Sequence, residues 1–125
     1  MRGSGLNTPT ISCPVLSRFF AYRLAFESAL LVDEVSKSWA RPSLVEQARR
    51  AADSVVLNLA EGNDAPRGSR DRARYQGYAL KSARETLSAL SLAAAKGLGD
   101  PAAMAAAYAK ANHVVAILVR VTCGT

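Results

Sequence analysis

The sequence predicts an all-α protein, an antiparallel up-down-up-down four-helix bundle. Half of the 125 residues are hydrophobic and only 6% are aromatic; the excess is mostly alanine, which favours helices and lets them pack closely. Four segments carry apolar residues at three- and four-residue intervals, and short stretches rich in glycine or proline separate them. Because a chain of this length buries one core, we expect one domain over residues 15–125, preceded by a flexible tail over residues 1–14.

The first expected helix begins near Val15 and ends near Lys37 or Ser38. Its apolar residues recur at helical spacing, and they are Leu16, Phe19, Phe20, Leu24, Leu30, Leu31, Val35 and Trp39. Phe26 and Val32 widen this set beyond the single stripe that a bundle needs. The surplus hints at a second buried face on this helix.

The second expected helix spans residues 42–61. Pro42 suits its first turn, because the missing N–H has no helical partner there. Gly62 is expected to end the helix in a left-handed conformation. One face of the helical wheel is apolar and consists of Val45, Ala48, Ala52, Val55, Val56 and Leu59. The other face is polar, and Leu57 is its exception.

The third expected helix follows a loop over residues 62–68, which is rich in helix-breaking residues. Ser69 is a suitable N-cap, and the helix is expected to run to about Lys96, with Gly97 and Gly99 closing it. Its expected core residues are Ala73, Gln76, Leu80, Ala83, Leu87, Leu90 and Ala94.

The fourth expected helix begins with Asp100 as N-cap and Pro101 in the first turn, and it ends at Gly124. Its inward stripe is Met104, Ala107, Ala111, Val115, Leu118 and Val119.

No segment is expected to span a membrane. The most apolar stretch, residues 104–121, is interrupted by Lys110, Asn112 and His113. The N-terminus lacks an apolar run of signal-peptide length. We therefore expect a cytoplasmic protein with no membrane partner.

The sequence contains no catalytic or metal-binding constellation. His113 is the only histidine, it lies among apolar residues, and no Glu-x-x-His pair or phosphate-binding glycine loop occurs. Cys13 and Cys123 are expected to be reduced thiols, although a disulfide between them is conceivable. We expect neither enzymatic activity nor a cofactor.

A net charge of +6 favours attraction to polyanions. An alternative of equal weight is that the basic residues only keep an alanine-rich oligomer soluble. The candidates for nucleic-acid binding lie in and just before the third helix, and they are Arg67, Arg70, Arg74, Tyr78, Lys81 and Arg84. Arg72 belongs to the same basic run.

On a helical wheel Arg70, Arg74 and Lys81 fall within about 40° of one another, with Tyr78 beside them. A stripe of cations with an aromatic residue is able to bind a phosphate backbone and a base. The alternative is a solvated outer face in which Lys81 pairs with Glu85 one turn later.

A second cluster occupies the polar face of the second helix and consists of Arg50, Ser54, Leu57, Asn58 and Glu61. Polar residues at this spacing around a leucine are typical of a subunit contact, and also of an ordinary wet surface. Because the first helix also has surplus apolar residues, we expect this cluster to form an oligomer interface.

Residues 44–87 resemble a known family. The run QARRAADSVVLNLAEG at residues 47–62, followed by Ser69 and a tyrosine-containing segment with Ser82 and Glu85, is similar to the four-helix-bundle proteins encoded in intervening sequences of bacterial 23S ribosomal RNA genes. The matching residues are Arg49, Arg50, Ala51, Ala52, Ser54, Val55, Asn58, Ala60, Glu61 and Gly62.

The resemblance implies an antiparallel bundle that assembles into a ring, a pentamer. The chain is also similar to the accessory variability determinant of diversity-generating retroelements, a basic pentamer that associates with a reverse transcriptase and nucleic acid. We therefore expect a non-enzymatic homo-oligomer that binds RNA, DNA or a protein that processes them. The alternative is an interaction scaffold or assembly subunit with no nucleic-acid role.

Overall fold

The computed structural model describes residues 14–123, with side chains described for residues 19–122. Within this range the chain forms four helices and no strand: α1 (Pro14–Ser36), α2 (Pro42–Asp64), α3 (Arg70–Ala95) and α4 (Pro101–Cys123). The expected all-α fold class with four helices is confirmed. The tail expected for residues 1–14, apart from Pro14, lies outside the described residues, as does Gly124.

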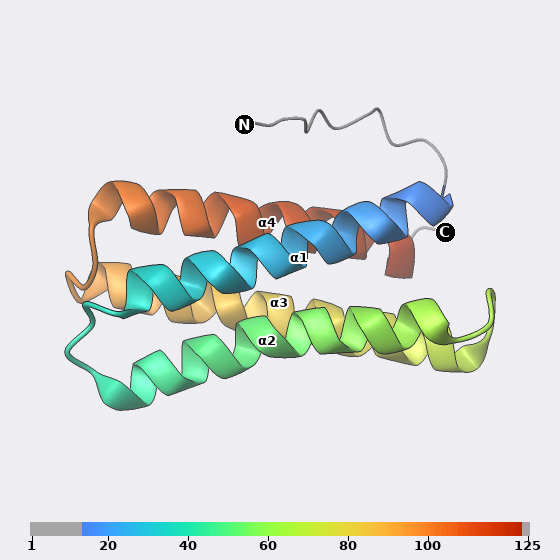
Figure 1. Cartoon of the computed structure of the whole chain (residues 1–125), viewed down its shortest axis with the longest axis horizontal. Coiled ribbons are helices and arrows are strands. Elements are labelled where there is room, and N and C mark those ends of the chain that lie inside the picture. Colours follow the sequence, from blue (N-terminus) through green and yellow to red (C-terminus); the bar gives the residue numbers. More distant parts are fainter. Residues whose placement is uncertain (1–13, 124–125) are drawn as a thin grey trace.

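Each helix packs against two others (Figure 1). α1 contacts α2 and α4, and α3 likewise contacts α2 and α4. The three connections, residues 37–41, 65–69 and 96–100, are short, so consecutive helices lie side by side. The α2–α3 contact is the most extensive of the four. The four contacts form a closed ring of helices, and the grooves on the outside of the bundle lie between neighbouring helices.

The core is built largely from small residues. Ala48, Ala79, Ala93 and Ala107 have no exposed surface, and they let the helices approach closely. Larger buried side chains fill the space between the alanines, and they are Leu90, Leu118, Val32 and Val114.

The expected core face of the first helix is partly wrong. Phe19 is 59% exposed, and Leu30 and Phe26 are exposed with it, whereas Val32 is fully buried. The face of α1 that meets α2 and α4 also carries Ala21, Leu24, Ala25, Ala29 and Val35. Because alanines occupy much of the buried face, the spacing of the large apolar residues alone did not separate buried residues such as Leu24 and Val35 from exposed ones such as Phe19.

The expected end of the second helix at Gly62 is also wrong. α2 continues to Asp64, and Gly62 is buried within it. A Cβ atom at Gly62 would lie 3.3 Å from the Cβ of Tyr75, which is tighter than ordinary van der Waals contact. The glycine is therefore required for the close approach of α2 and α3 and not for a left-handed cap.

α3 and α4 begin at the N-cap residues that the sequence predicts. Ser69 caps α3, and its hydroxyl accepts a hydrogen bond from the Arg72 N–H at 3.1 Å. Asp100 caps α4, and its Oδ2 accepts from the Ala103 N–H at 2.9 Å. Gly97, just beyond α3, has the expected positive φ of 75°.

Two expected core residues of α3 are exposed, Ala73 and Ala94. The buried face of α3 is centred on Ala79, Ala83 and Leu90. Ala73 lies outside the arc of the wheel that these residues define, and Ala94 lies in the last turn, where little packs over it.

α4 departs from the expectation about membrane spans. By length and composition alone, Pro101–Thr122 is able to cross a membrane: its mean hydropathy is 1.4, and 28% of the window is buried in the bundle. Lys110, Asn112 and His113 therefore do not take this stretch below the criterion, and the expectation that no segment spans a membrane stays a prediction. The inner face of α4, including Ala107 and Leu118, is buried in the core, and the Lys110 Nζ donates to Glu27 Oε1 of α1 at 3.1 Å.

Candidate nucleic-acid interface

The candidate interface is the outward face of α3. α3 carries five basic and two acidic residues, whereas α2 carries two basic and four acidic residues. The predicted residues Arg67, Arg70, Arg74, Tyr78, Lys81 and Arg84 are all exposed. Because α3 is continuous, the stripe expected from the helical wheel lies on one surface.

Most of these cations have no carboxylate partner. Among the side chains that the structure describes, Arg70, Lys81 and Arg84 form no ion pair. The Lys81–Glu85 pair, which was the alternative explanation of the stripe, is therefore not formed within this chain. Unpaired cations on a surface are available to phosphates.

Arg74 is the exception in the stripe. Its Nη2 lies 3.0 Å from Asp71 Oδ1, and both side chains are at least half exposed. Its guanidinium also lies over the Tyr75 ring, 5.5 Å from the centroid. An exposed pair of this kind contributes little to stability, so Arg74 is able to exchange Asp71 for another anion.

Arg72 belongs to the basic run in the sequence but not to the surface. It is only 8% exposed. Its Nε donates to the carbonyl of Ala65 at 3.1 Å, and its Nη2 donates to the carbonyl of Asn63 at 3.3 Å. These carbonyls lie at the end of α2, where the helix leaves C=O groups without partners. Arg72 is therefore a structural residue that ties the start of α3 to the end of α2.

A groove of about 820 Å³ lies between α2 and α3. We call it the α2–α3 groove. Lys81 and Arg84 line it from α3, and Arg50 and Ser54 line it from α2. The structure thus brings part of the predicted nucleic-acid stripe together with part of the predicted oligomer interface. Sequence reasoning had kept these two sets apart.

The predicted interface cluster on α2 does not act as one network. Ser54 Oγ and Ser82 Oγ lie 2.8 Å apart, which links α2 to α3 within one chain. Asn58 Nδ2 donates to the carbonyl and the hydroxyl of Ser54 at 2.9 and 3.0 Å. Ser54 therefore joins α2 to α3, whereas Asn58 bonds to Ser54 within α2.

The remaining members of the cluster face outward. Arg50 Nη2 lies 2.8 Å from Glu46 Oε2, and the two side chains are 73% and 70% exposed. Leu57 is 64% exposed, and Glu61 is exposed too. An exposed leucine between charged residues is consistent with a contact to another molecule.

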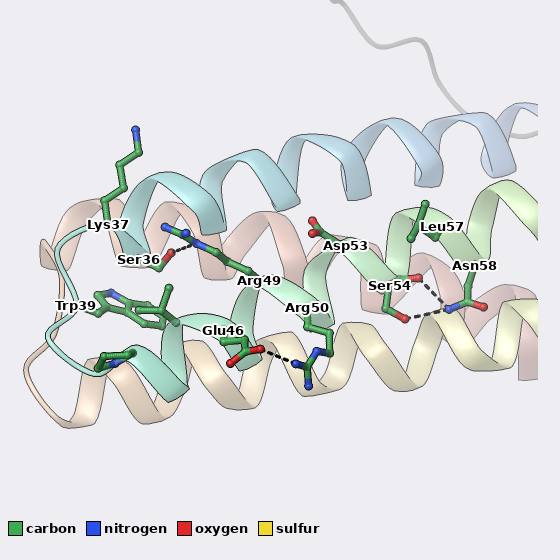
Figure 2. Close-up of a pocket in the computed structure, with 12 residues that line it drawn as sticks. Ser36, Lys37, Trp39, Glu46, Arg49, Arg50, Asp53, Ser54, Leu57 and Asn58 are labelled. Atoms are coloured by element: carbon green, nitrogen blue, oxygen red, sulfur yellow. Dashed lines mark hydrogen bonds and ion pairs between the residues drawn. The ribbon is translucent and has the colours of Figure 1, made fainter.

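A second groove, of about 840 Å³, lies between the end of α1 and the outer face of α2. Figure 2 shows Arg49 reaching from α2 towards Ser36 of α1, and its Nε donates to Ser36 Oγ at 2.9 Å. Lys37 and Arg50 line this groove with Glu46 and Asp53. Because both signs of charge are mixed here, this groove is less suited to phosphate than the α2–α3 groove.

The negative charge of the Asp53 carboxylate in the second groove is unfavourable. Partial burial raises the pKa of its carboxyl above the ordinary value, the negative charge of Asp33 raises this pKa further, and Arg49 offsets only part of the effect. Within the described side chains, Asp53 has no ion pair of its own.

A metal site needs several ligands close together in the described part of the chain. Within it, no group of three histidine, cysteine, aspartate or glutamate side chains is placed to hold a metal ion. His113 packs edge-on against Phe20, with the ring centroids 5.6 Å apart.

These features define a class of protein: a small basic bundle of four helices, with a cluster of unpaired cations on α3 and exposed apolar residues on α1 and α2. Residues 18–120 match the family of 23S rRNA-intervening sequence proteins. The chain belongs to this family, as the run at residues 47–62 indicated. A comparison with curated proteins found no match.

Sequence reasoning assigned Phe19 and Leu30 to the core instead of the outward face of α1, and it missed the place of Arg50 in the α2–α3 groove. The alanines of α1 were the available signal for the first, since they mark a face on which helices approach closely. The second depends on how α2 and α3 are rotated relative to each other, and no local pattern specifies this.

Proposed function

We propose that this chain is a non-enzymatic, homo-oligomeric bundle that binds RNA or DNA through the outward face of α3. A nucleic-acid-processing partner, such as a reverse transcriptase, would bind the same face or the nucleic acid that it holds. The protein acts in the cytoplasm and needs neither cofactor nor metal. α4 serves as a helix of the bundle and not as a membrane span.

The observation that carries the proposal is the set of unpaired cations on α3. Arg70, Lys81 and Arg84 are exposed and have no ion pair among the described side chains. A surface that only confers solubility has no need to concentrate cations on one helix while a neighbouring helix is acidic. Phosphates neutralise such a stripe and release condensed counterions, so binding is salt-dependent.

The antiparallel up-down-up-down order and the pentameric ring are part of this proposal. The short connections and the closed order of helix contacts support the first. Exposed apolar side chains support self-association, because Phe19, Phe26 and Leu30 are spaced by seven and four residues and so share one face of α1. Leu57 adds a large apolar residue on α2.

Retention of a labelled RNA and a labelled DNA duplex at low salt tests nucleic-acid binding. The variant Arg70→Glu/Arg74→Glu reverses two charges on α3. The variant Arg23→Glu/Arg120→Glu makes the same change in net charge on α1 and α4, where both arginines are exposed. We expect the first variant to lose most binding and the second to lose little. Equal loss in the two variants would show that only net charge matters.

The second candidate function is a protein-interaction scaffold without nucleic acid. The exposed apolar residues of α1 favour it, because their contact chemistry suits a protein surface. Light scattering at micromolar concentration tests self-association, and we expect a multiple of the 13.2 kDa chain mass. Leu57→Glu, which places a charge in the proposed contact, is expected to lower that mass. A monomeric wild-type protein contradicts the proposed assembly.

A further inference from the structure

The α2–α3 groove carries more cationic than anionic side chains. Lys81, Arg84 and Arg50 line it, and Glu85 is the one carboxylate among its lining residues. Lys81 and Arg84 have no ion pair among the described side chains. Arg50 pairs only with the highly exposed Glu46, and such a pair is easily exchanged. The groove therefore offers three cations to an anionic chain.

The groove is open, and one of its lining hydroxyls is already paired within the bundle. Ser54, which lines it, shares a hydrogen bond of 2.8 Å with Ser82. Gly77 lies on the α3 side, and a Cβ atom built there meets nothing within 4 Å. Any larger side chain at position 77 would therefore project into the groove. Leu92 and Tyr78 are exposed on the same helix, and Leu92 lines one part of the groove.

The geometry of the bundle decides which form of nucleic acid fits. α3 packs along one side on α2 and along the other on α4, so only an outer arc of the helix is exposed. The groove that α3 shares with α2 carries cations on both walls, Arg50 on α2 and Lys81 and Arg84 on α3. A chain of phosphates that lies along the groove therefore meets cations from both sides.

A flexible single strand is able to follow a cationic groove of this kind with its backbone. The phosphates of a duplex lie on the convex outside of a stiff double helix, so a duplex meets the rim of the groove and not both of its walls. One strand is able to lie along the groove, with its phosphates near the three cations and its bases turned towards the exposed Leu92.

We propose that the α2–α3 groove binds single-stranded nucleic acid in preference to duplex. This inference rests on the proposed function, since it assumes that α3 meets nucleic acid. It adds the substrate form, and it makes Lys81, Arg84 and Arg50 the residues that hold the strand. Arg67 and Arg70, nearer the start of α3, extend the same positive surface beyond the groove.

Fluorescence anisotropy with one labelled 20-nucleotide RNA, alone and annealed to its complement, tests the preference. At about 50 mM salt we expect the single strand to bind at least tenfold more tightly than the duplex. If neither form binds, the proposed function is wrong and this inference falls with it. If both bind equally, or the duplex binds more tightly, nucleic-acid binding stands and the groove preference is overturned.

Gly77→Leu tests the groove without changing charge. The leucine occupies the groove, and single-strand binding is expected to weaken at least fivefold while the thermal midpoint does not fall, because glycine disfavours a helix. Ala94→Leu is the matched control, since Ala94 is exposed on α3 and lines the opposite groove, between α3 and α4. It is expected to bind as the wild type does. Wild-type binding by Gly77→Leu would contradict the groove site.

Lys81→Glu/Arg84→Glu tests the cations of the groove, with Arg23→Glu/Arg120→Glu as the control of equal charge. The groove variant is expected to lose single-strand binding at least tenfold more than the control does. Equal losses would overturn the assignment of the strand to this groove.

Discussion

Replacing Arg72 with methionine removes a buried guanidinium while keeping most of an apolar stem. In the wild type this guanidinium donates from Nε and Nη2 to the carbonyls of Ala65 and Asn63. Hydrogen bonds to charged groups each contribute about 1.5–3 kcal/mol. The burial of the guanidinium offsets part of this, because Arg72 Nη1 is buried without a partner. We expect Arg72→Met to lower the free energy of unfolding by about 3 kcal/mol.

Urea unfolding followed by far-ultraviolet circular dichroism measures this loss. Wild type and variants are compared at one protein concentration, because self-association raises apparent stability. The matched control is Arg70→Met, since Arg70 is exposed two residues away, and its effect is expected to stay within about 0.5 kcal/mol. If Arg72→Met is no less stable than Arg70→Met, the structural role of Arg72 is refuted.

Two glycine-to-alanine substitutions are expected to differ in their effect on the free energy of unfolding, and the effect of a third substitution, at Asp53, is expected to depend on pH. Gly77→Ala is expected to raise the free energy of unfolding by about 0.5–1 kcal/mol, because it improves helix propensity in open space. Gly62→Ala is expected to lack this gain, since its Cβ would lie 3.3 Å from the Cβ of Tyr75, and an equal gain in urea unfolding would contradict the close packing. Asp53→Asn is expected to stabilise the protein at pH 7: burial and the charge of Asp33 raise the pKa of Asp53 above 3.8, so the wild type loses stability as pH rises through that pKa. The difference should vanish near pH 3, and a difference independent of pH would show that the carboxyl charge is not the cause.

The starts of the helices were predictable because they depend on local chemistry. Pro42, Ser69 and Asp100 act through the residue itself or through an N–H three residues later. A linear sequence displays such short-range rules directly. The number of helices and their order along the chain follow from them.

The features that sequence missed depend on a partner helix. Gly62 reads as a helix terminator until Tyr75 of α3 is placed against it. Arg72 reads as a surface cation until the end of α2 supplies two carbonyls. Phe19 reads as core until alanines are seen to occupy the inner face of α1. In each case tertiary packing overrides a local rule.

The candidate site likewise has features that one helix determines and features that depend on two helices. The exposure of the five candidate residues of α3 was predictable, because they follow the helical period of one element, and they are Arg70, Arg74, Tyr78, Lys81 and Arg84. The α2–α3 groove was not, since it requires Arg50 of α2 to face Lys81 and Arg84 of α3. Ser54 shows the same limit, because its hydrogen bond to Ser82 joins α2 to α3 and no pattern within α2 indicates it.

The salt dependence of RNA binding tests the central claim most directly. For single strands, the logarithm of the binding constant falls with the logarithm of salt concentration with a slope of about −0.7 for each phosphate neutralised. If Arg50, Arg70, Lys81 and Arg84 each neutralise one phosphate, the expected slope is about −3, and it should become shallower by about 0.7 when Arg84 alone is replaced by glutamine. A slope near zero, or no binding at about 50 mM salt, would contradict the claim that the outward face of α3 binds nucleic acid.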